Sequence, residues 1–221
     1  MKEVSISLLS VMDKINSSRF FLDFESAKVD YFHIDVMDGK FVEKNTAVKM
    51  KELANTAVMV SNVGIDVHLM VENVRDFIEE YVSFRPKIIS FHKEATKSDD
   101  EMMELINIIK GSGSMVGIAI SPDTNVEELY PFLKYIHVAL IMSVYPGKGG
   151  QDFIEDSFYK ISKLKKYIED NNLDTLIEVD GGIDGDNCEK VSNSGADILV
   201  SGSYPTLAND YIAAVKRLKN C

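Results

Sequence analysis

The sequence is poor in features that mark a multidomain or linker-containing protein. No stretch rich in proline, glycine and serine interrupts its 221 residues, and no low-complexity tract is present. We therefore expect one domain over residues 1–221, a length that barrels of alternating strands and helices commonly use.

Signals for export and membrane insertion are also missing. The N-terminal stretch MKEVSISLLSVMDK is too polar for a signal peptide, and no hydrophobic run reaches the length of a membrane span. Only two cysteines occur, and the second, Cys221, is the last residue and is expected to be loose. We therefore expect a cytoplasmic protein with no membrane partner, whose Cys188 and Cys221 are reduced thiols.

Basic residues are fewer than acidic residues. The chain has 24 lysines and arginines against 35 acidic residues, which gives a net charge of −11. An acidic surface argues against binding to nucleic acid or to anionic membranes. An anionic substrate would then need a local binding site rather than long-range attraction.

Eight short apolar, β-rich runs alternate with amphipathic stretches. Strands that alternate with helices predict a parallel sheet with right-handed crossovers, and eight such units predict a closed (β/α)8 TIM barrel. An open doubly wound sheet is the alternative, but SISLLSVMD at the first run has no glycine for a dinucleotide fingerprint. The expected strands are Val4–Leu9, Tyr31–Val36, Ile65–Val71, Ile88–Phe91, Met115–Ile120, Ile136–Ser143, Leu176–Val179 and Ile198–Val200. The expected helical stretches include 73–84, 100–113, 125–134 and 156–171, with N-caps at Asn73 and Asn125 and a helix end at Gly111 or Gly113.

Ionisable residues lie at the ends of three of these runs. His33 and Asp35 are two residues apart in a strand and so share one face, and buried strands rarely carry such residues without a reason. His68 lies in the third run, and Asp180 ends the seventh. In a barrel all carboxyl ends of the strands open on one face, so these four side chains are predicted to converge. Two imidazoles and two carboxylates suit one divalent metal ion, Zn²⁺, Fe²⁺ or Mn²⁺; the alternative is hydrogen-bonded core residues.

The other ionisable residues of this region have simpler interpretations. His92 ends the fourth run, and we expect it to contact substrate or a ligand residue rather than the ion. His137 precedes the sixth run and is expected to be structural. Asp38 belongs to a Met-Asp-Gly turn, where aspartate is common.

Glycines and methionines also gather near the strand ends. Glycine-rich loops after the last three runs could let backbone N–H groups approach a phosphate, or could be only tight turns. Lys148 could add charge there or be solvated. Three methionines could cap a reaction intermediate or fill the core. The residues concerned are Gly147, Lys148, Gly149, Gly150, Gly181, Gly182, Gly202 and Ser203 in the loops, and the methionines Met37, Met70 and Met142.

The motifs together resemble the ribulose-phosphate 3-epimerase family. HIDVMDGKFV, DVHLMV, SVYPGKGGQDFI, VDGGI and SGADILVSGS occur in the family's order and spacing, and the resemblance spans Ser7 to Ser203. It implies a (β/α)8 barrel that binds one divalent ion and inverts C3 of a ketose phosphate, most simply D-ribulose 5-phosphate. It also implies a homo-oligomer, a dimer or a hexamer.

The resemblance assigns roles to individual residues. The metal ligands would be His33, Asp35, His68 and Asp180, with Asp35 as proton acceptor and Asp180 as proton donor. Ser7 and His68 would contact substrate, and the segments 147–150, 180–182 and 202–203 would hold substrate and phosphate. Metal on the substrate oxygens would stabilise an enediolate between the two carboxylates.

Departures from the family pattern surround the sugar and phosphate positions. Tyr145 stands where the family usually has asparagine, Lys148 replaces a phenylalanine, and Ser121 replaces an asparagine. Ile6 stands in place of proline before Ser7, FVEKN replaces FVPN, and GSYPT lacks the usual apolar residues. The reaction type is therefore better determined than the substrate, and D-allulose 6-phosphate is the alternative.

Two other classes remain as hypotheses. A sugar-phosphate-binding paralogue without turnover is one, although Asp35 and Asp180 are intact. A decarboxylase or aldolase of the same barrel superfamily is the other, but those enzymes use an Asp-x-Lys donor, and HIDVMD and DVHLMV contain no lysine.

Overall fold

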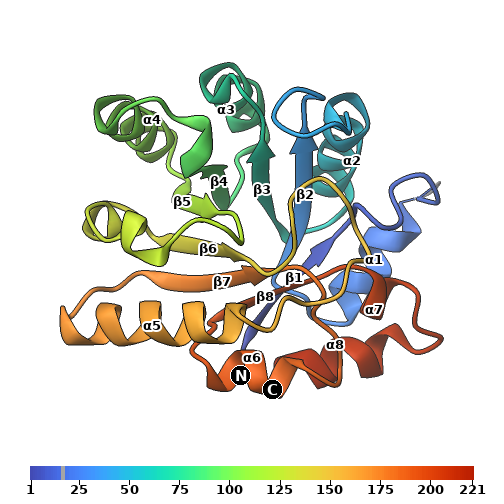
Figure 1. Ribbon diagram of the computed structural model, residues 1–221. Coiled ribbons are helices and arrows are strands. Elements are labelled where there is room, and N and C mark those ends of the chain that lie inside the picture. The colour runs from blue at the N-terminus through green and yellow to red at the C-terminus, as the bar shows by residue number, and fades with distance from the viewer. Residues whose placement is uncertain (16–17) are drawn as a thin grey trace.

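Eight parallel strands close into a barrel in the computed structural model, which describes residues 1–15 and 18–221. Each strand pairs with its neighbours in chain order, and β1 (Glu3–Ser7) closes the ring by pairing with β8 (Ile198–Ser201). Helices surround the sheet (Figure 1). The predicted (β/α)8 barrel is confirmed, and the doubly wound alternative is wrong.

The remaining strands fall on the predicted β-rich runs. They are β2 (Tyr31–Met37), β3 (Gly64–Met70), β4 (Ile88–His92), β5 (Met115–Ile120), β6 (Val138–Met142) and β7 (Leu176–Asp180). The α-helices are α1 (Arg19–Ser26), α2 (Ala47–Val60), α3 (Val74–Tyr81), α4 (Asp99–Gly111), α5 (Ser157–Asp170), α6 (Cys188–Asn193), α7 (Ser203–Thr206) and α8 (Tyr211–Lys219). Short 3-10 helices are η1 (Val82–Phe84), η2 (Lys93–Ala95), η3 (Val126–Leu129) and η4 (Leu133–Tyr135).

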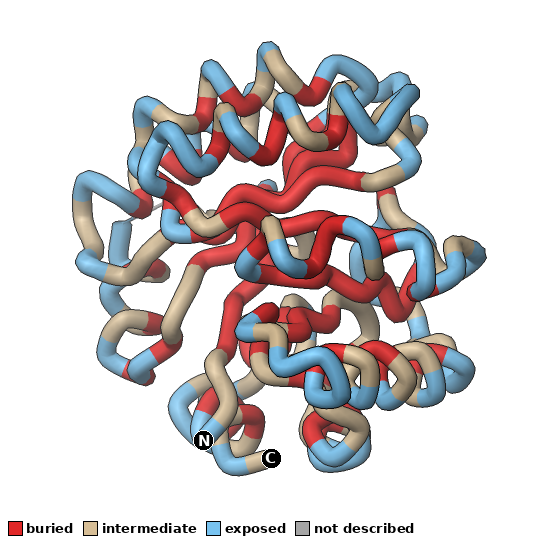
Figure 2. The backbone as a smooth tube through the Cα atoms, turned by 90° about the vertical axis from the view of Figure 1, so that its left-hand side faces the viewer, coloured by how far each residue is buried: buried red, intermediate tan, exposed pale blue. Residues whose placement is uncertain are grey.

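Strand alternation separates a polar barrel interior from an apolar layer under the helices. On β2 the residues Phe32, Ile34 and Val36 are fully buried in the large core cluster, whereas His33 and Asp35 belong to the other face. Figure 2 shows the strands as continuous buried segments, with the exposed residues on the surrounding helices and loops.

The amino ends of the strands are closed by apolar side chains. Ile88, Val138 and Ile198, the first residues of β4, β6 and β8, form one buried cluster. The polar side chains of the barrel interior therefore face the carboxyl ends of the strands, which is where barrel sites are built.

One predicted helix is wrong. Residues 125–134 form η3 and η4 rather than one α-helix, because Pro131 lies between them. Proline lacks the N–H of an α-helix and disfavours helical geometry in the residue before it. Asn73 and Asn125 occupy the predicted N-cap positions, but neither side chain makes a capping hydrogen bond.

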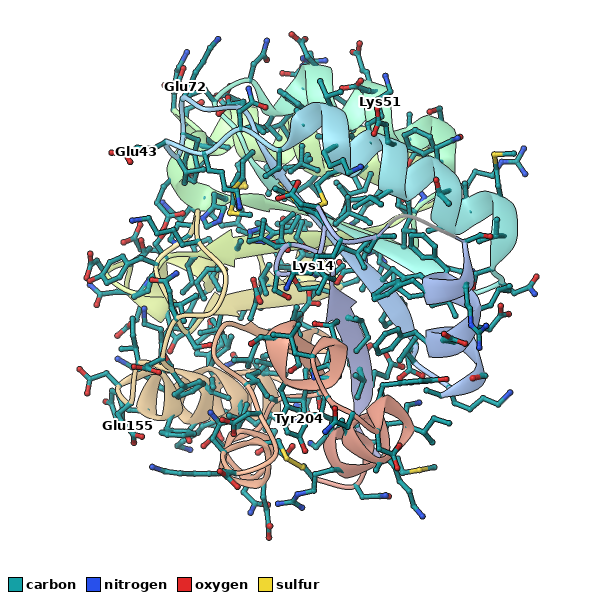
Figure 3. The ribbon with its side chains drawn as sticks, turned by 90° about the vertical axis from the view of Figure 1, so that its right-hand side faces the viewer. Lys14, Glu43, Lys51, Glu72, Glu155 and Tyr204 are labelled. Atoms are coloured by element: carbon teal, nitrogen blue, oxygen red, sulfur yellow. A yellow bond between two sulfur atoms is a disulfide. The ribbon has the colours of Figure 1, made fainter. Side chains whose placement is uncertain are left out.

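The prediction of two reduced cysteines is also wrong. Cys188, the first residue of α6, and Cys221 form a disulfide with a Cα–Cα distance of 5.8 Å, which Figure 3 draws as a yellow bond. α8 brings the end of the chain back beside β1, where the Lys2 N–H donates to the Lys219 carbonyl at 3.0 Å. The two ends therefore lie side by side (Figure 1).

Within the described residues no helix has the length and apolarity needed to cross a membrane.

Candidate active site

Four predicted ligands converge inside the carboxyl end of the barrel. One atom from each of His33, Asp35, His68 and Asp180 lies within 4.8 Å of the other three. The Asp35 Oδ1 atom is 3.4 Å from His33 Nε2 and 3.5 Å from His68 Nδ1. The Asp180 Oδ2 atom is 3.9 Å and 3.8 Å from the same two nitrogens.

The two imidazole nitrogens that face this cluster fit a metal ion. His33 Nε2 and His68 Nδ1 are buried, and neither has a hydrogen-bond partner in the part of the chain that the structure describes. A buried nitrogen without a partner costs free energy unless something binds it. Ligand atoms about 2.1 Å from a shared ion lie roughly 3.0–3.4 Å apart, close to the separations found here. The site therefore fits one divalent cation.

One buried carboxylate that the sequence analysis missed orients His33, and a second lies near it. Its Nδ1 lies 2.6 Å from Asp66 Oδ2, which also accepts a hydrogen bond from Ser5 Oγ at 2.9 Å. A bond at Nδ1 leaves the lone pair of Nε2 free for a ligand role. Glu178 is fully buried with one oxygen 4.0 Å from His33 Nδ1. Asp66 and Glu178 each stand two residues before a predicted ligand, so the alternation argument used for His33 could have found both.

Ser7 holds the proposed proton acceptor. Its hydroxyl donates to Asp35 Oδ2 at 2.8 Å, so Asp35 Oδ1 faces the two imidazoles. Ser7 is nearly buried, and its backbone pairs with β2 next to His33. The predicted substrate-contact position therefore lies against a predicted catalytic group.

The environment gives the two proposed catalytic carboxyl groups different pKa values. Burial raises the pKa of Asp180 to about 7; the charge of His33 opposes this and the charges of Asp35 and Asp66 reinforce it. Burial alone would also raise the pKa of Asp35, but the positive charge of His33 outweighs it and lowers that pKa below its usual value. Two carboxyls with separated pKa values can act as an acid and a base at the same pH.

His92 lies outside this cluster of four ligands. Its Nε2 is 2.9 Å from Nε2 of His68, on the side of His68 that faces away from Asp35. Its Nδ1 is 3.1 Å from Glu94 Oε2. It contacts a predicted ligand residue, as expected, while His137 is structural and accepts a backbone hydrogen bond from Val116.

A cavity of about 560 Å³ opens above the cluster. Asp35 and Asp180 line it, while the backbone loops after β1, β6, β7 and β8 form its walls. In Figure 3, Lys14, Glu155 and Tyr204 mark the segments after β1, β6 and β8. Apart from His68, every predicted substrate-contact or cap residue lines this cavity: Ser7, Met37, Met70, Met142, Gly147, Lys148, Gly149, Gly150, Gly181, Gly182, Gly202 and Ser203.

Two of these glycines leave no room for a side chain. A Cβ at Gly182, which has φ +64°, would lie 2.5 Å from the Phe153 backbone nitrogen. A Cβ at Gly181 would lie 2.4 Å from Val144. The Ser143 hydroxyl further links the two loops, because it lies 2.9 and 2.7 Å from the carbonyl oxygens of Asp180 and Gly181 and can donate to either. The loops after β6 and β7 therefore form one wall of the cavity.

Comparison with known proteins points to one family. A family model described as the ribulose-phosphate 3 epimerase family matches residues 3–205. The ribulose-phosphate 3-epimerase of Helicobacter pylori is 37% identical over 88% of this chain and 87% of its own length. That of Methanocaldococcus jannaschii is 38% identical over 88% of this chain and 80% of its own. The chloroplastic ribulose-5-phosphate-3-epimerase of Arabidopsis thaliana is 36% identical over 88% and 68%.

Solved structures with lower identity share the fold. A 3-hexulose-6-phosphate synthase from Salmonella typhimurium has a TM-score of 0.69 at 14% identity, over 100% of this chain and 97% of that one. A thiamine phosphate pyrophosphorylase from Pyrococcus furiosus has a TM-score of 0.65 at 13% identity, over 99% and 94%. At these identities the likeness extends to the barrel alone.

Proposed function

Because this chain belongs to the ribulose-phosphate 3-epimerase family, we propose that it interconverts D-ribulose 5-phosphate and D-xylulose 5-phosphate. The chain is an isomerase that acts on carbohydrates. The observation that carries the mechanism is the pair Asp35 and Asp180, two carboxyl groups that lie beside His33 and His68 at the floor of one cavity.

We propose that the two carboxyls exchange protons with C3 from opposite faces of the sugar. Ionised Asp35, held by Ser7, accepts the C3 proton, and the electron pair moves toward the C2 carbonyl to give a planar 2,3-enediolate. Protonated Asp180 then delivers its proton to the other face of C3, and the roles reverse in the opposite direction. A divalent ion, Zn²⁺, Fe²⁺ or Mn²⁺, held by His33, Asp35, His68 and Asp180 would supply a Lewis acid for the negative charge on the substrate oxygens.

The glycine-rich wall supports a phosphorylated substrate. Backbone N–H groups in glycine turns can approach an anion closely, and a net charge of −11 offers no general attraction for one. D-Allulose 6-phosphate is the second candidate, because Tyr145, Lys148 and Ser121 depart from the family pattern near the sugar. The dimer or hexamer implied by the family stays a prediction.

The test is turnover of both sugar phosphates in D₂O by metal-loaded protein. Deuterium should enter C3, metal analysis should give about one ion per chain, and unphosphorylated ribulose should be a poor substrate. Asp35→Asn and Asp180→Asn should each lower kcat in both directions by about 10²-fold or more, while Asp170→Asn, at the exposed end of α5, should not. Each variant must first be shown to keep its ion, since His33→Ala and His68→Ala should lose it.

Four results would change the proposal. Product without C3 label, or a metal-loaded Asp35→Asn protein with nearly wild-type turnover, would refute the two-carboxylate mechanism. A higher kcat/KM for allulose 6-phosphate would reverse the substrate order and leave the mechanism intact. No epimerisation of either substrate would favour a non-catalytic sugar-phosphate-binding protein.

A further inference from the structure

A chain of hydrogen bonds runs from Glu94 through His92 to His68. His92, the last residue of β4, is fully buried. Its Nδ1 lies 3.1 Å from Glu94 Oε2, and its Nε2 lies 2.9 Å from His68 Nε2. We propose that Glu94, acting through His92, fixes the tautomer of His68 so that His68 Nδ1 is free to bind the divalent ion; this rests on the proposed metal site.

The direction of each hydrogen bond follows from the donors around Glu94. Its Oε1 accepts from the Ser121 N–H at 2.8 Å and from the Thr124 hydroxyl. A carboxylate surrounded by donors acts as an acceptor, so Oε2 accepts the proton-bearing Nδ1 of His92.

One protonated nitrogen per neutral imidazole then determines the rest of the chain. With its proton on Nδ1, His92 presents an unprotonated Nε2, which can only accept. The group that it faces is His68 Nε2, which must therefore carry the proton of His68. The lone pair of His68 is left on Nδ1, the atom 3.5 Å from Asp35 and 3.8 Å from Asp180.

The two proposed imidazole ligands are thus oriented in opposite senses. His33 turns Nε2 to the cluster because Asp66 holds its Nδ1. His68 turns Nδ1 to the cluster because a carboxylate holds its Nε2 through a second imidazole. Hydrogen bonds of this kind fix the ring orientation and basicity of metal-binding histidines.

The acceptor end of the chain is anchored by the loop after β5. The ammonium group of Lys160, on α5, donates to the carbonyls of Ser121, Pro122 and Thr124 at 3.1, 2.6 and 2.7 Å. These bonds hold the donors that face Glu94. On the other side, the ring of Phe41 packs against His92 with a centroid distance of 4.9 Å. Glu94 and His92 therefore both have fixed positions.

Glu94→Gln is the sharpest variant because it keeps the shape of the side chain and reverses its hydrogen bonding. The amide oxygen must face the Ser121 and Thr124 donors, which turns the amide NH₂ toward His92 Nδ1. His92 then carries its proton on Nε2, and His68 must move its own proton to Nδ1, the metal-facing atom. We expect the affinity for Zn²⁺, measured by competition with a chromophoric chelator, to fall about 10–100-fold.

Two further variants and a spectroscopic measurement isolate the tautomer. Thr124→Val removes a neighbouring donor but keeps the carboxylate and its Ser121 donor, so its Zn²⁺ affinity should change by no more than about twofold. His92→Phe keeps a ring beside Phe41 but cannot accept, and should weaken Zn²⁺ binding as Glu94→Gln does. The chain has four histidines, so long-range ¹H–¹⁵N correlations of the metal-free protein can identify the protonated nitrogen of each.

The spectra should show His92 protonated on Nδ1 and His68 on Nε2 in the wild type, and His92 protonated on Nε2 in Glu94→Gln. A wild-type His92 protonated on Nε2, or a Glu94→Gln protein with unchanged tautomers and Zn²⁺ affinity, would overturn the proposal. Wild-type protein with the expected tautomers that binds no Zn²⁺ would refute the proposed metal site while supporting the order of the hydrogen bonds.

Discussion

At the scale of single residues, the protonation of Asp180 links metal binding to pH. Burial raises the pKa of its carboxyl to about 7, and the charges of Asp35 and Asp66 add to this. The pKa of His33 is also raised: burial opposes protonation, but the negative charges of Asp66 and Asp35 outweigh it. A bound cation favours the unprotonated form of both groups, so metal binding competes with their protonation and releases protons.

We therefore expect the affinity for Zn²⁺ to increase with pH. Below pH 7 the Asp180 proton alone should make the dissociation constant fall about tenfold per pH unit, and the His33 proton should steepen this dependence. Chelator competition between pH 5.5 and 7.5 measures it. Asp180→Asn should bind more weakly, with about one proton fewer released. Equal wild-type affinities at both ends of this range would contradict the raised pKa of Asp180.

At the scale of elements, the cavity wall depends on how closely the turn after β7 packs on the loop after β6. Gly182 has a positive φ, and its missing Cβ leaves room for the backbone of Phe153 and Gln151. Gly113, after α4, provides a control, since it has φ +86° but no described atom within 4 Å of the position of its Cβ. Alanine at Gly113 tests the cost of the backbone conformation alone, whereas alanine at Gly182 adds the cost of a steric clash.

We expect Gly113→Ala to lower the free energy of unfolding by about 1–2 kcal/mol, the usual cost of a left-handed conformation. Gly182→Ala should cost more and should also lower kcat/KM, because the loop after β6 must shift away from the cavity. Urea denaturation and steady-state kinetics measure the two effects. A Gly182→Ala protein as stable as Gly113→Ala, with wild-type kcat/KM, would show that the two loops do not depend on this contact.

At the scale of the whole molecule, the disulfide fastens the last part of the chain to the barrel. Cys188 and Cys221 are 33 residues apart, and the enclosed segment contains β8, α7 and α8. Gly202 and Ser203, which line the cavity, lie within it. A covalent bond across such a segment restricts the unfolded chain and so favours the folded state.

We expect Cys221→Ser to lower the free energy of unfolding of the oxidised protein by about 2–4 kcal/mol. With a reductant present, the variant and the wild type should unfold at nearly the same urea concentration, because neither then has the bond. Thiol titration of unreduced wild-type protein checks the bond itself. Two free thiols per chain in that titration would show that the disulfide does not form.

The sequence by itself determined the strands and the set of proposed ligands. A strand alternates its side chains with a period of two residues, so His33 and Asp35 could be assigned to one interior face without coordinates. The same local rule extends to Asp66 and Glu178. The carboxyl-end location of Asp180 followed from the parallel topology, and motif spacing identified the family.

Only the tertiary structure decided the contacts that depend on the closing of the barrel and on the return of the chain. The pairing of Cys188 with Cys221 requires α8 to carry the chain end back beside β1 and α6, which no local pattern records. Which nitrogen of His68 faces Asp35, and which faces His92, depends on the relative positions of β2, β3 and β4. These distances join residues far apart in sequence, and they are set by sheet register and packing, whereas local periodicity fixes only the face on which each residue lies.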